Sequence, residues 1–365
     1  MKDDARWMRS ALGLARQAVG RTWPNPAVGA IIVRDGRVLG RGVTAPGGRP
    51  HAETEALRMA GDAVGATAYV TLEPCAHHGI TPPCSQSLID ARIARVVCPL
   101  SDPDPRVSGR GFNALEAAGV SVDVGLMERE ARALNAGFLS RIERGRPHVM
   151  LKLATTLDGR IATGAGESRW ITGPAARRRV HLMRAASDAV LIGAGTARAD
   201  DPMLDVRGVG LSDRIPVRIV ADPSLTLSLS SRLARSVDAG PVWLLAGARA
   251  DAGRAEACRA HGIEVLTVPS TADGVLSPGA MLTQLGDRGI TRLMCEGGGR
   301  LAATLASAGL VDEIALFQAG KLIGNDGTPA IAAFGLEELA AAPAFDLATV
   351  EQIGSDMFSR WTVRR

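Results

Sequence analysis

The segment at residues 71–84 gathers side chains that bind transition metals. Its sequence is TLEPCAHHGITPPC, which contains Cys75 and Cys84, and a histidine, His51, lies upstream in the run His-Ala-Glu. One imidazole and two thiolates are common ligands of zinc, and three protein ligands leave the fourth corner of a tetrahedral site for water. We therefore expect His51, Cys75 and Cys84 to bind Zn²⁺.

Glu53 stands two residues after His51 and is not needed as a ligand. Zinc lowers the pKa of a bound water to near 7, so hydroxide is available at neutral pH. A carboxylate at this position can take the proton of that water and pass it to a departing amine, which is the arrangement of zinc deaminases. We therefore expect Glu53 to be catalytic.

A closed structural zinc site is the alternative interpretation of the same segment. Either His77 or His78 would supply a fourth protein ligand, and zinc would then stabilise the fold without reacting. An acid in the first turn of a helix is also common for a purely electrostatic reason, because the helix dipole favours negative charge there. The position of Glu53 beside His51 favours the catalytic interpretation.

Local patterns place His51 and Cys84 at the starts of two helices. Residues 51–61 have a helical pattern that opens near His51 and ends at a glycine, and residues 84–94 have one that opens directly after two prolines. A helix N-terminus favours the thiolate form of a cysteine, because the helix dipole is positive there. Both positions therefore suit metal binding.

The rest of the first part alternates strands and helices. Helices are predicted across 111–118 and 127–143, and strands at 66–72, 95–100, 120–124 and, as a hairpin joined by Arg-Asp-Gly, 27–33 and 37–43. The polar, turn-rich segment 143–149 follows. It predicts a boundary between two domains, 1–146 and 147–365.

The pattern then restarts in the second part. Strands are predicted at 148–157, 187–193, 216–222, 241–247, 263–268, 291–297 and 312–320. Helical patterns lie between most of them, which predicts a mostly parallel sheet covered on both faces. Residues 295–309 combine a strand end, three glycines and a helix, a junction where backbone N–H groups can approach a phosphate. A tight structural turn would explain these glycines equally well.

Length and composition are those of a globular protein with two domains. The chain has 365 residues, of which 46% are hydrophobic and 22% charged. The sequence has no apolar run of about 18 residues, so we do not expect a membrane span. The acidic start MKDDARWMRSALGLA does not match a secretion signal. Five cysteines, an odd number, favour a reducing compartment over a disulfide framework. We expect a cytoplasmic protein that is not bound to a membrane.

Positive charge is carried almost wholly by scattered arginines. The net charge is +4, and there are only one Tyr and six Phe, so aromatic platforms for stacking nucleic-acid bases are lacking. Nucleic acid is therefore not an expected partner. Arginine matches phosphate with its planar fork of donors, which favours a phosphorylated small molecule as the partner.

Three motifs of the first domain agree in order and spacing with those of one enzyme family. They are PNPAVGAIIV at 24–33, HAETEAL at 51–57 and the metal-binding segment at 71–84. Zinc deaminases in general place their two cysteines as C-x-x-C, whereas eight residues separate Cys75 from Cys84 here. The domain resembles the deaminase domain of the bifunctional riboflavin-biosynthesis deaminase/reductases. Ile80 departs from that family's pattern, which usually has a basic residue at this position.

The second domain resembles the reductase domain of the same family, whose fold is similar to dihydrofolate reductase. The resemblance rests on LKLATTLDGRIA at 151–162, SRWITG at 168–173, LIGAGTARADDPMLDVR at 191–207 and CEGGG at 295–299, while QAGKLIG at 318–324 lacks the family's usual proline before lysine. It implies the fold class, which is α/β throughout: an N-terminal cytidine-deaminase-like α/β/α sandwich and a C-terminal dihydrofolate-reductase-like α/β domain.

The resemblance also implies roles for individual residues. Asn25 would contact the pyrimidine, and His77 or His78 would line its pocket. The residues that would hold NADPH are Ala154, Trp170, Thr196, Asp200, Gly297, Gly298 and Gly299. The residues that would hold the substrate are Ser168, Arg184, Leu204, Arg207 and Glu296. Lys152 and Asp200 are candidates for orienting the reacting sugar, and Trp170 would fit a core position equally well.

The activities implied by the resemblance are two successive steps of riboflavin biosynthesis. The first is zinc-dependent hydrolytic deamination of 2,5-diamino-6-ribosylamino-4(3H)-pyrimidinone 5′-phosphate. The second is NADPH-dependent reduction of the ribosyl side chain, which gives 5-amino-6-ribitylamino-uracil 5′-phosphate. Deaminase domains of this kind often associate, so a homo-oligomer is a further option.

Two other functions remain open from the sequence. One is a zinc deaminase of other bases or nucleosides whose second domain only senses NADP. The other is a non-catalytic protein with structural zinc. Ammonia release without NADPH turnover would indicate the first, and metal binding that depends on His77 and His78 without either activity would indicate the second.

Overall fold

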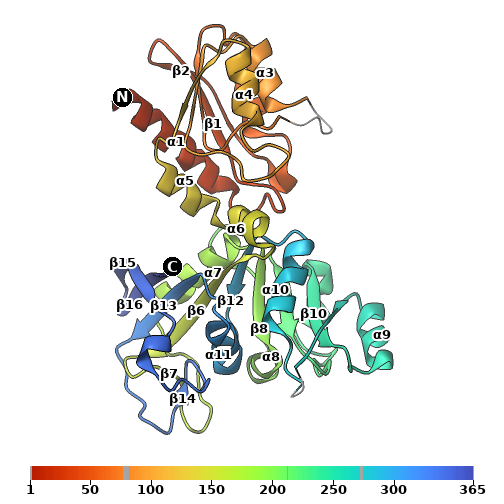
Figure 1. The fold of residues 1–365 in the computed structure, drawn as a ribbon. Coiled ribbons are helices and arrows are strands. Elements are labelled where there is room, and N and C mark those ends of the chain that lie inside the picture. Colours follow the sequence, from red (N-terminus) through yellow and green to blue (C-terminus); the bar gives the residue numbers. More distant parts are fainter. Residues whose placement is uncertain (1, 77–81, 212, 272–273, 365) are drawn as a thin grey trace. The chain divides into compact units, whose positions relative to one another are not determined.

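The computed structural model describes residues 2–76, 82–211, 213–271 and 274–364, and Figure 1 shows its fold. The chain divides into two compact units, Met1–Gly145 and Arg146–Arg365; the expected domains were 1–146 and 147–365. Among the described residues, no helix has both the length and the apolar character needed to cross a membrane.

The first unit is built on a five-stranded sheet with the order β2-β1-β3-β4-β5. The expected hairpin is confirmed, because β1 and β2 pair antiparallel, whereas β3, β4 and β5 are parallel neighbours. The elements are α1 (Lys2–Ala18), β1 (Gly29–Arg34), β2 (Arg37–Val43), η1 (Pro46–Gly48), α2 (Ala52–Ala60), β3 (Thr67–Val70), α3 (Cys84–Asp90), β4 (Arg95–Cys98), α4 (Arg110–Ala117), β5 (Ser121–Val124), α5 (Glu128–Leu134) and α6 (Ala136–Arg144).

Glycines let helices lie directly on both faces of this sheet. A methyl group on Gly29 would lie 2.1 Å from Ala11 O of α1, and one on Gly42 would lie 2.0 Å from Ala52 O of α2. Gly42 pairs with Ala30, so its side-chain position is on the face opposite to that of the adjacent Gly29. Helices α1 and α2 therefore cover opposite faces, which confirms the expected α/β/α sandwich.

The helical stretch expected across 127–143 is confirmed, but it consists of two helices. The stretch is split into α5 and α6 at Asn135, whose buried side chain binds Ala27, two residues before β1. The Asn135 Oδ1 accepts a hydrogen bond from Ala27 N at 3.0 Å, and its Nδ2 donates to Ala27 O at 3.1 Å. The break therefore comes from a tertiary contact with residues more than a hundred positions away.

The second unit is built on a nine-stranded sheet with the order β11-β10-β9-β8-β12-β6-β13-β16-β15. Its elements are β6 (His148–Thr156), β7 (Arg160–Ala162), α7 (Pro174–Ala185), β8 (Ala189–Gly193), α8 (Ala194–Asp200), β9 (Val217–Ala221), η2 (Ala234–Ala239), β10 (Val242–Gly247), α9 (Ala252–Ala260), β11 (Glu264–Val268), α10 (Pro278–Asp287), β12 (Arg292–Cys295), α11 (Gly299–Ser307), β13 (Glu313–Ala319), β14 (Thr328–Pro329), η3 (Leu339–Ala341), β15 (Phe345–Ile353) and β16 (Asp356–Val363).

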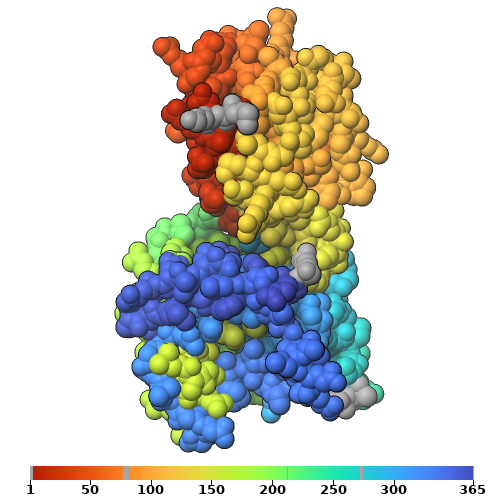
Figure 2. All heavy atoms as spheres, turned by 60° about the vertical axis from the view of Figure 1, so that its left-hand side comes forward, coloured from red at the N-terminus to blue at the C-terminus, as the bar shows by residue number. Residues whose placement is uncertain are grey.

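The seven strands expected in this unit are confirmed, and they are parallel neighbours from β11 to β13. Four strands were not expected. β16 and β15 add an antiparallel hairpin to the edge of the sheet, and β7 pairs with β14. In Figure 2 residues near 160, in yellow-green, lie among the blue residues of the last part of the chain.

Candidate active sites

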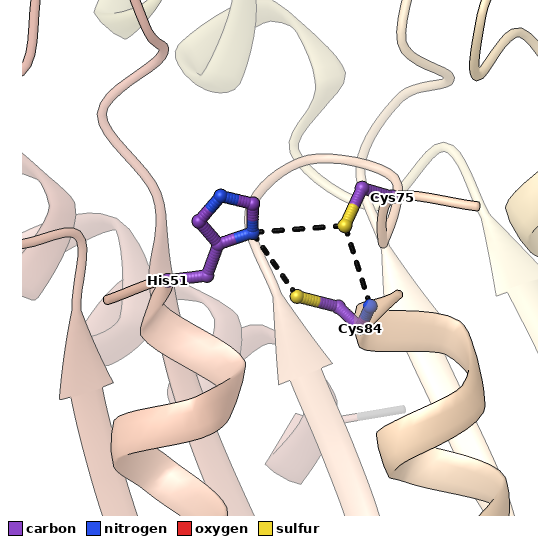
Figure 3. A group of neighbouring side chains, drawn as sticks. All are labelled: His51, Cys75 and Cys84. Carbon is purple, nitrogen blue, oxygen red and sulfur yellow. Dashed lines mark hydrogen bonds between the residues drawn. The ribbon is translucent and has the colours of Figure 1, made fainter. Parts of the chain in front are cut away.

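The three expected zinc ligands lie together in the first unit (Figure 3). His51 is the N-cap of α2, Cys84 is the first residue of α3, and Cys75 lies in the loop after β3. The His51 Nδ1 is 3.2 Å from Cys84 Sγ and 3.6 Å from Cys75 Sγ, and the three donor atoms lie within 4.8 Å of one another. Donors around a tetrahedral zinc are about 3.5–3.8 Å apart, so this donor set fits the metal.

The protonation of the two thiols supports the same conclusion. Hydrogen bonds from Cys84 and then from His51 lower the pKa of Cys75 to about 4. The hydrogen bond to Cys75 and burial raise the pKa of Cys84 far above its usual value. Two adjacent thiolates are stable together only beside a cation, because like charges at this distance repel strongly. The pair therefore has the chemistry of a metal-binding dithiolate.

Glu53 lies in the first turn of α2, two residues after His51, and only 4% of it is exposed. Burial, followed by the charge of Cys75, raises the pKa of Glu53 to about 7. Its carboxylate is also hydrogen-bonded to Cys84. A carboxyl group with a pKa near neutrality can both take and give a proton under physiological conditions, so its protonation suits a proton shuttle.

Glu73 is a buried residue of this site that the sequence analysis did not single out. Its carboxylate accepts three backbone hydrogen bonds, from Asp102 N at 3.0 Å, Gly109 N at 3.0 Å and Gly111 N at 2.9 Å. Glu73 precedes Cys75 by two residues, so it ties the ligand-bearing loop to the start of α4. A signal was present in the sequence, because a charged residue directly after a buried strand requires partners.

Asn25 lies in the loop between α1 and β1. Its Nδ2 donates to Gly47 O at 3.2 Å, and a methyl group on Gly48 would lie 2.1 Å from the same Nδ2. Gly48 precedes His51 by three residues, so Asn25 packs on the turn that leads to this metal ligand. His77, His78 and Ile80, for which the sequence suggested roles, lie outside the described residues.

In the second unit, three charged residues expected at the substrate site form one buried cluster. The Glu296 Oε1 accepts from Arg184 Nε at 2.6 Å, and its Oε2 accepts from Arg184 Nη2 at 3.0 Å. The Lys152 Nζ is 4.0 Å from Glu296 Oε2. Arg184 Nη1 also donates to Asp205 O at 2.9 Å. Glu296 therefore orients two cations, one on α7 and one on β6.

Burial and charge act in opposite directions in this cluster. Burial lowers the pKa of Lys152, and the carboxylate of Glu296 opposes that shift. Burial would raise the pKa of Glu296, but the charge and hydrogen bonds of Arg184 lower it overall. Glu296 therefore stays ionised, and Lys152 is a cation that gives up its proton more readily than an exposed lysine does.

Gly297, Gly298 and Gly299 connect the end of β12 to α11, and one of them is hydrogen-bonded to α8. Gly298 is the N-cap of α11, and its N–H donates to Thr196 Oγ1 at 3.0 Å. Methyl groups would lie 3.0 Å from Thr196 Oγ1 if added to Gly298 and 2.9 Å from Pro329 O if added to Gly299. The glycines are therefore needed for close packing at the start of α11, a helix end of the kind that favours anions.

The other residues of the expected NADPH and substrate sets are spread over several elements. Trp170 is 60% exposed, so a core position for it is wrong, and the Arg177 guanidinium lies 4.5 Å from its ring centre. Leu204 is buried, and Arg207 pairs with Asp205. Ala154 lies on β6, Ser168 lies in the segment before α7, and Asp200 ends α8.

Both halves of the chain match known protein families. Residues 147–359 match the model of the RibD C-terminal domain, and residues 1–100 match that of the cytidine and deoxycytidylate deaminase zinc-binding region. The riboflavin biosynthesis protein RibD of Escherichia coli (strain K12) is 43% identical, with 97% of this chain and 98% of that protein covered. The chain belongs to the RibD family.

Solved structures of RibD proteins have the same fold. Acinetobacter baumannii RibD, form 1, gives a TM-score of 0.89 at 37% identity and covers 100% of this chain and 99% of that one. The diaminohydroxyphosphoribosylaminopyrimidine deaminase/5-amino-6-(5-phosphoribosylamino)uracil reductase of Thermotoga maritima gives 0.87 at 33% identity, with 99% of each chain covered. The fold class and the family expected from the sequence are thus confirmed.

Membership of this family establishes the two general activities of the chain. The chain combines a zinc-dependent deaminase with an NADPH-dependent reductase, and both act in riboflavin biosynthesis. The expectation of an enzyme with these two cofactors is confirmed, and a non-catalytic protein with structural zinc is excluded.

Replacing Glu73 by Gln is expected to impair the deaminase selectively. The new amide group would turn a donor toward backbone N–H groups, at a cost of about 1–3 kcal/mol for buried groups left unpaired. Ammonia release and zinc content should both fall, while NADPH oxidation by the second unit is retained. Glu116→Gln, at an exposed position of α4, is the matched control. Wild-type rates of ammonia release by the Glu73→Gln protein would contradict this role.

Proposed function

We propose that the first unit hydrolytically removes the ring amino group of 2,5-diamino-6-ribosylamino-4(3H)-pyrimidinone 5′-phosphate. The second unit then reduces the ribosyl side chain to ribityl, giving 5-amino-6-ribitylamino-uracil 5′-phosphate. The two activities for which the Thermotoga maritima relative is named support this substrate class. The observation that carries the proposal is the convergence of one imidazole, two thiols and a buried carboxylate in the first unit.

His51, Cys75 and Cys84 would hold zinc, and Glu53 would be the acid that transfers protons. Zinc held by these ligands would supply a nucleophilic hydroxide at neutral pH. In the hydrolysis, hydroxide would replace the amino group on the ring carbon, with cleavage of the carbon–nitrogen bond. Glu53 takes the proton of the attacking water and transfers it to the departing nitrogen, which leaves as ammonia. A pKa of about 7 suits both transfers.

Asn25 would orient the pyrimidine at this site. Its Nδ2 already binds Gly47 O, and this bond fixes the side-chain amide so that its carbonyl oxygen can accept from the ring. His77 or His78 would line the same pocket, as the family resemblance implies. A small phosphorylated pyrimidine, rather than nucleic acid, is the proposed partner, and the proposed location is the cytoplasm.

In the second unit, the start of α11 would hold the pyrophosphate of NADPH. Gly297, Gly298 and Gly299 would contact the pyrophosphate, and Thr196 holds this turn in place through the Gly298 N–H. Ala154, Trp170 and Asp200 complete the proposed contacts with the cofactor. Bound NADPH would supply the hydride that reduces the open form of the sugar. The protein itself would then position the sugar next to the nicotinamide ring.

The charged cluster would hold the phosphorylated sugar. Arg184 is fixed by Glu296, so its remaining donors have a defined direction and can meet a phosphate or a hydroxyl group. Arg207 adds a second guanidinium, and Ser168 and Leu204 complete the proposed contacts. Lys152 and Asp200 would orient the reacting sugar carbon, because Lys152 lies beside Glu296. Both units then act on one phosphorylated pyrimidine, which explains their union in one chain.

Replacing Glu53 by Gln is expected to stop deamination while zinc remains bound. Loss of a general acid–base group lowers rates by about 10²–10⁴-fold, and Glu53 is not a ligand. The wild-type chain, given zinc and the diaminopyrimidine phosphate, should release ammonia and then oxidise NADPH. The Glu53→Gln protein should do neither, yet it should still oxidise NADPH when given the deaminated intermediate.

A control on the same helix separates this role from general damage. Glu55 lies in the same first turn of α2 and pairs with Arg58, and Glu55→Gln should deaminate at nearly the wild-type rate. Deamination by Glu53→Gln at the wild-type rate would overturn the assigned proton transfer, whereas release of zinc by this variant would identify Glu53 as a ligand.

Replacing Thr196 by Val is expected to weaken NADPH binding. The change removes the acceptor of the Gly298 N–H, a bond worth about 1 kcal/mol, or roughly a fivefold rise in the KM for NADPH. Thr304→Val, which alters a hydroxyl group bonded only within α11, is the control and should leave that KM unchanged. Ammonia release should be unaffected by either change. An unchanged KM for NADPH in Thr196→Val would contradict the proposed cradle.

A further inference from the structure

A cavity of about 260 Å³ lies in the second unit, where three neighbouring parallel strands begin. Its wall includes His148, Arg292 and Glu313, which are the first residues of β6, β12 and β13. His148 pairs with Arg292, and Met150 pairs with Glu313. Directly paired residues project on the same face of a sheet, so these four side chains lie on one face.

The inner wall of the cavity is apolar. Helix α7 contributes Leu182 and Met183, and the sheet contributes Met150, Leu293 and Phe358. Met183 and Met150 both pack against the core cluster that contains Phe358. Methionine side chains adapt to the shape of a ligand, and their sulfur atoms make favourable contacts with aromatic rings. This wall therefore suits a flat apolar ring.

Three guanidinium groups and one carboxylate also line the cavity. The Glu313 Oε1 accepts from Arg360 Nε at 2.8 Å and lies 2.7 Å from Arg360 Nη2. Arg292 and Arg179 are the other two arginines of the wall. Glu351, which is not part of the wall, pairs with Arg179 at 2.8 Å. Positive charge therefore exceeds negative charge at the cavity, even when Glu351 is counted.

Arg292 is the arginine of this group that the fold holds most deeply. Burial lowers the pKa of Arg292, and the charge of Glu313 opposes that shift. An arginine does not lose its proton in a protein, so its charge is kept in surroundings with little water. Such a charge is costly unless anions lie close to it, and Glu313 is also bound to Arg360. A second anion in the cavity would stabilise both guanidinium groups.

We propose that this cavity binds a small aromatic phosphate. The ring lies against Met150, Met183 and Phe358, and the phosphate group faces Arg292 and Arg360. The guanidinium fork matches phosphate oxygens, and a phosphate of nearly two negative charges balances the excess of positive charge. Sites for drug-sized ligands measure about 300–1,000 Å³, so the cavity fits one ring with one phosphate and is too small for a dinucleotide.

The cavity is a different site from the charged cluster of the reductase. Lys152 lies four residues after His148 on the same strand, which is roughly 13 Å along the sheet. Glu296 follows the end of β12, whereas Arg292 begins that strand. The two sites share helix α7, because Met183 lines the cavity and the next residue, Arg184, binds Glu296. A ligand in the cavity would thus contact the helix that positions Arg184.

Calorimetric titration of the full-length protein with three small probes tests the ligand class. The probes are phenyl phosphate, inorganic phosphate and benzoate, in a buffer without other phosphate. Phenyl phosphate should bind with a dissociation constant at least about tenfold below that of either other probe, because it alone combines an apolar ring with a doubly charged anion. Equal affinity for inorganic phosphate would overturn the role of the apolar wall, and equal affinity for benzoate would overturn the choice of phosphate.

Variants at the rim of the cavity test the location. Arg360→Gln removes one guanidinium, and Leu182→Glu adds a carboxylate at a side chain that is 40% exposed. Each change should raise the dissociation constant of phenyl phosphate by about 10- to 100-fold, through the loss of charged hydrogen bonds or through repulsion. Circular dichroism and NADPH oxidation check that both variants are folded.

Two control variants keep the wall of the cavity intact. Arg178→Gln alters an exposed arginine of α7 that does not line the cavity, and Arg207→Gln alters a proposed contact of the reductase substrate. Both should bind phenyl phosphate like the wild type. The proposal is overturned by a wild-type chain that shows no saturable binding, by unchanged binding in folded Arg360→Gln and Leu182→Glu, or by loss of binding in Arg207→Gln, which would place the probe in the reductase site.

Discussion

The deaminase half depends on one electrostatic constraint, the placement of two thiols and a buried carboxylate around a single imidazole. His51 and Cys84 each stand at the start of a helix, and the buried Glu53 follows one of them. Acidic groups packed this closely raise one another's pKa unless a cation is shared among them. Zinc, which this set of donor atoms fits, would allow the thiols of Cys75 and Cys84 to ionise together. The rest of the unit, including the loop held by Glu73, maintains these positions.

In the reductase half, the buried charges are balanced by other side chains of the same unit, without a metal ion. Arg184 and Lys152 lie against Glu296, so each buried charge has a partner before substrate arrives. Preorganised charges of this kind orient a phosphorylated sugar without reorganisation. Thr196 and the glycines beside it place the start of α11 at the same edge of the sheet. Strand ends and helix starts thus provide the polar groups in both units.

The sequence predicted the helices and strands whose first and last residues are determined by neighbouring residues. The helices that start at His51 and Cys84 follow from glycine, proline and helical spacing, and the resemblance supplied the fold of both units. Contacts between distant segments could not be predicted. The helical stretch divides at Asn135, whose side chain binds Ala27 just before β1, and Glu73 takes its partners from a segment further along the chain. The β15–β16 hairpin was missed because exposure of β15 on both faces removes the alternation that marks a half-buried strand.

X-ray absorption at the zinc edge of the full-length protein tests the central claim most directly. The account predicts two sulfur ligands at about 2.3 Å, one imidazole at about 2.0 Å and one light ligand that exchanges with solvent. Scattering from the outer atoms of imidazole rings counts the histidines that bind. A single imidazole would support an open catalytic site built from His51, Cys75 and Cys84. Two imidazoles would mean that a further histidine closes the site, and the hydrolytic mechanism would then be contradicted.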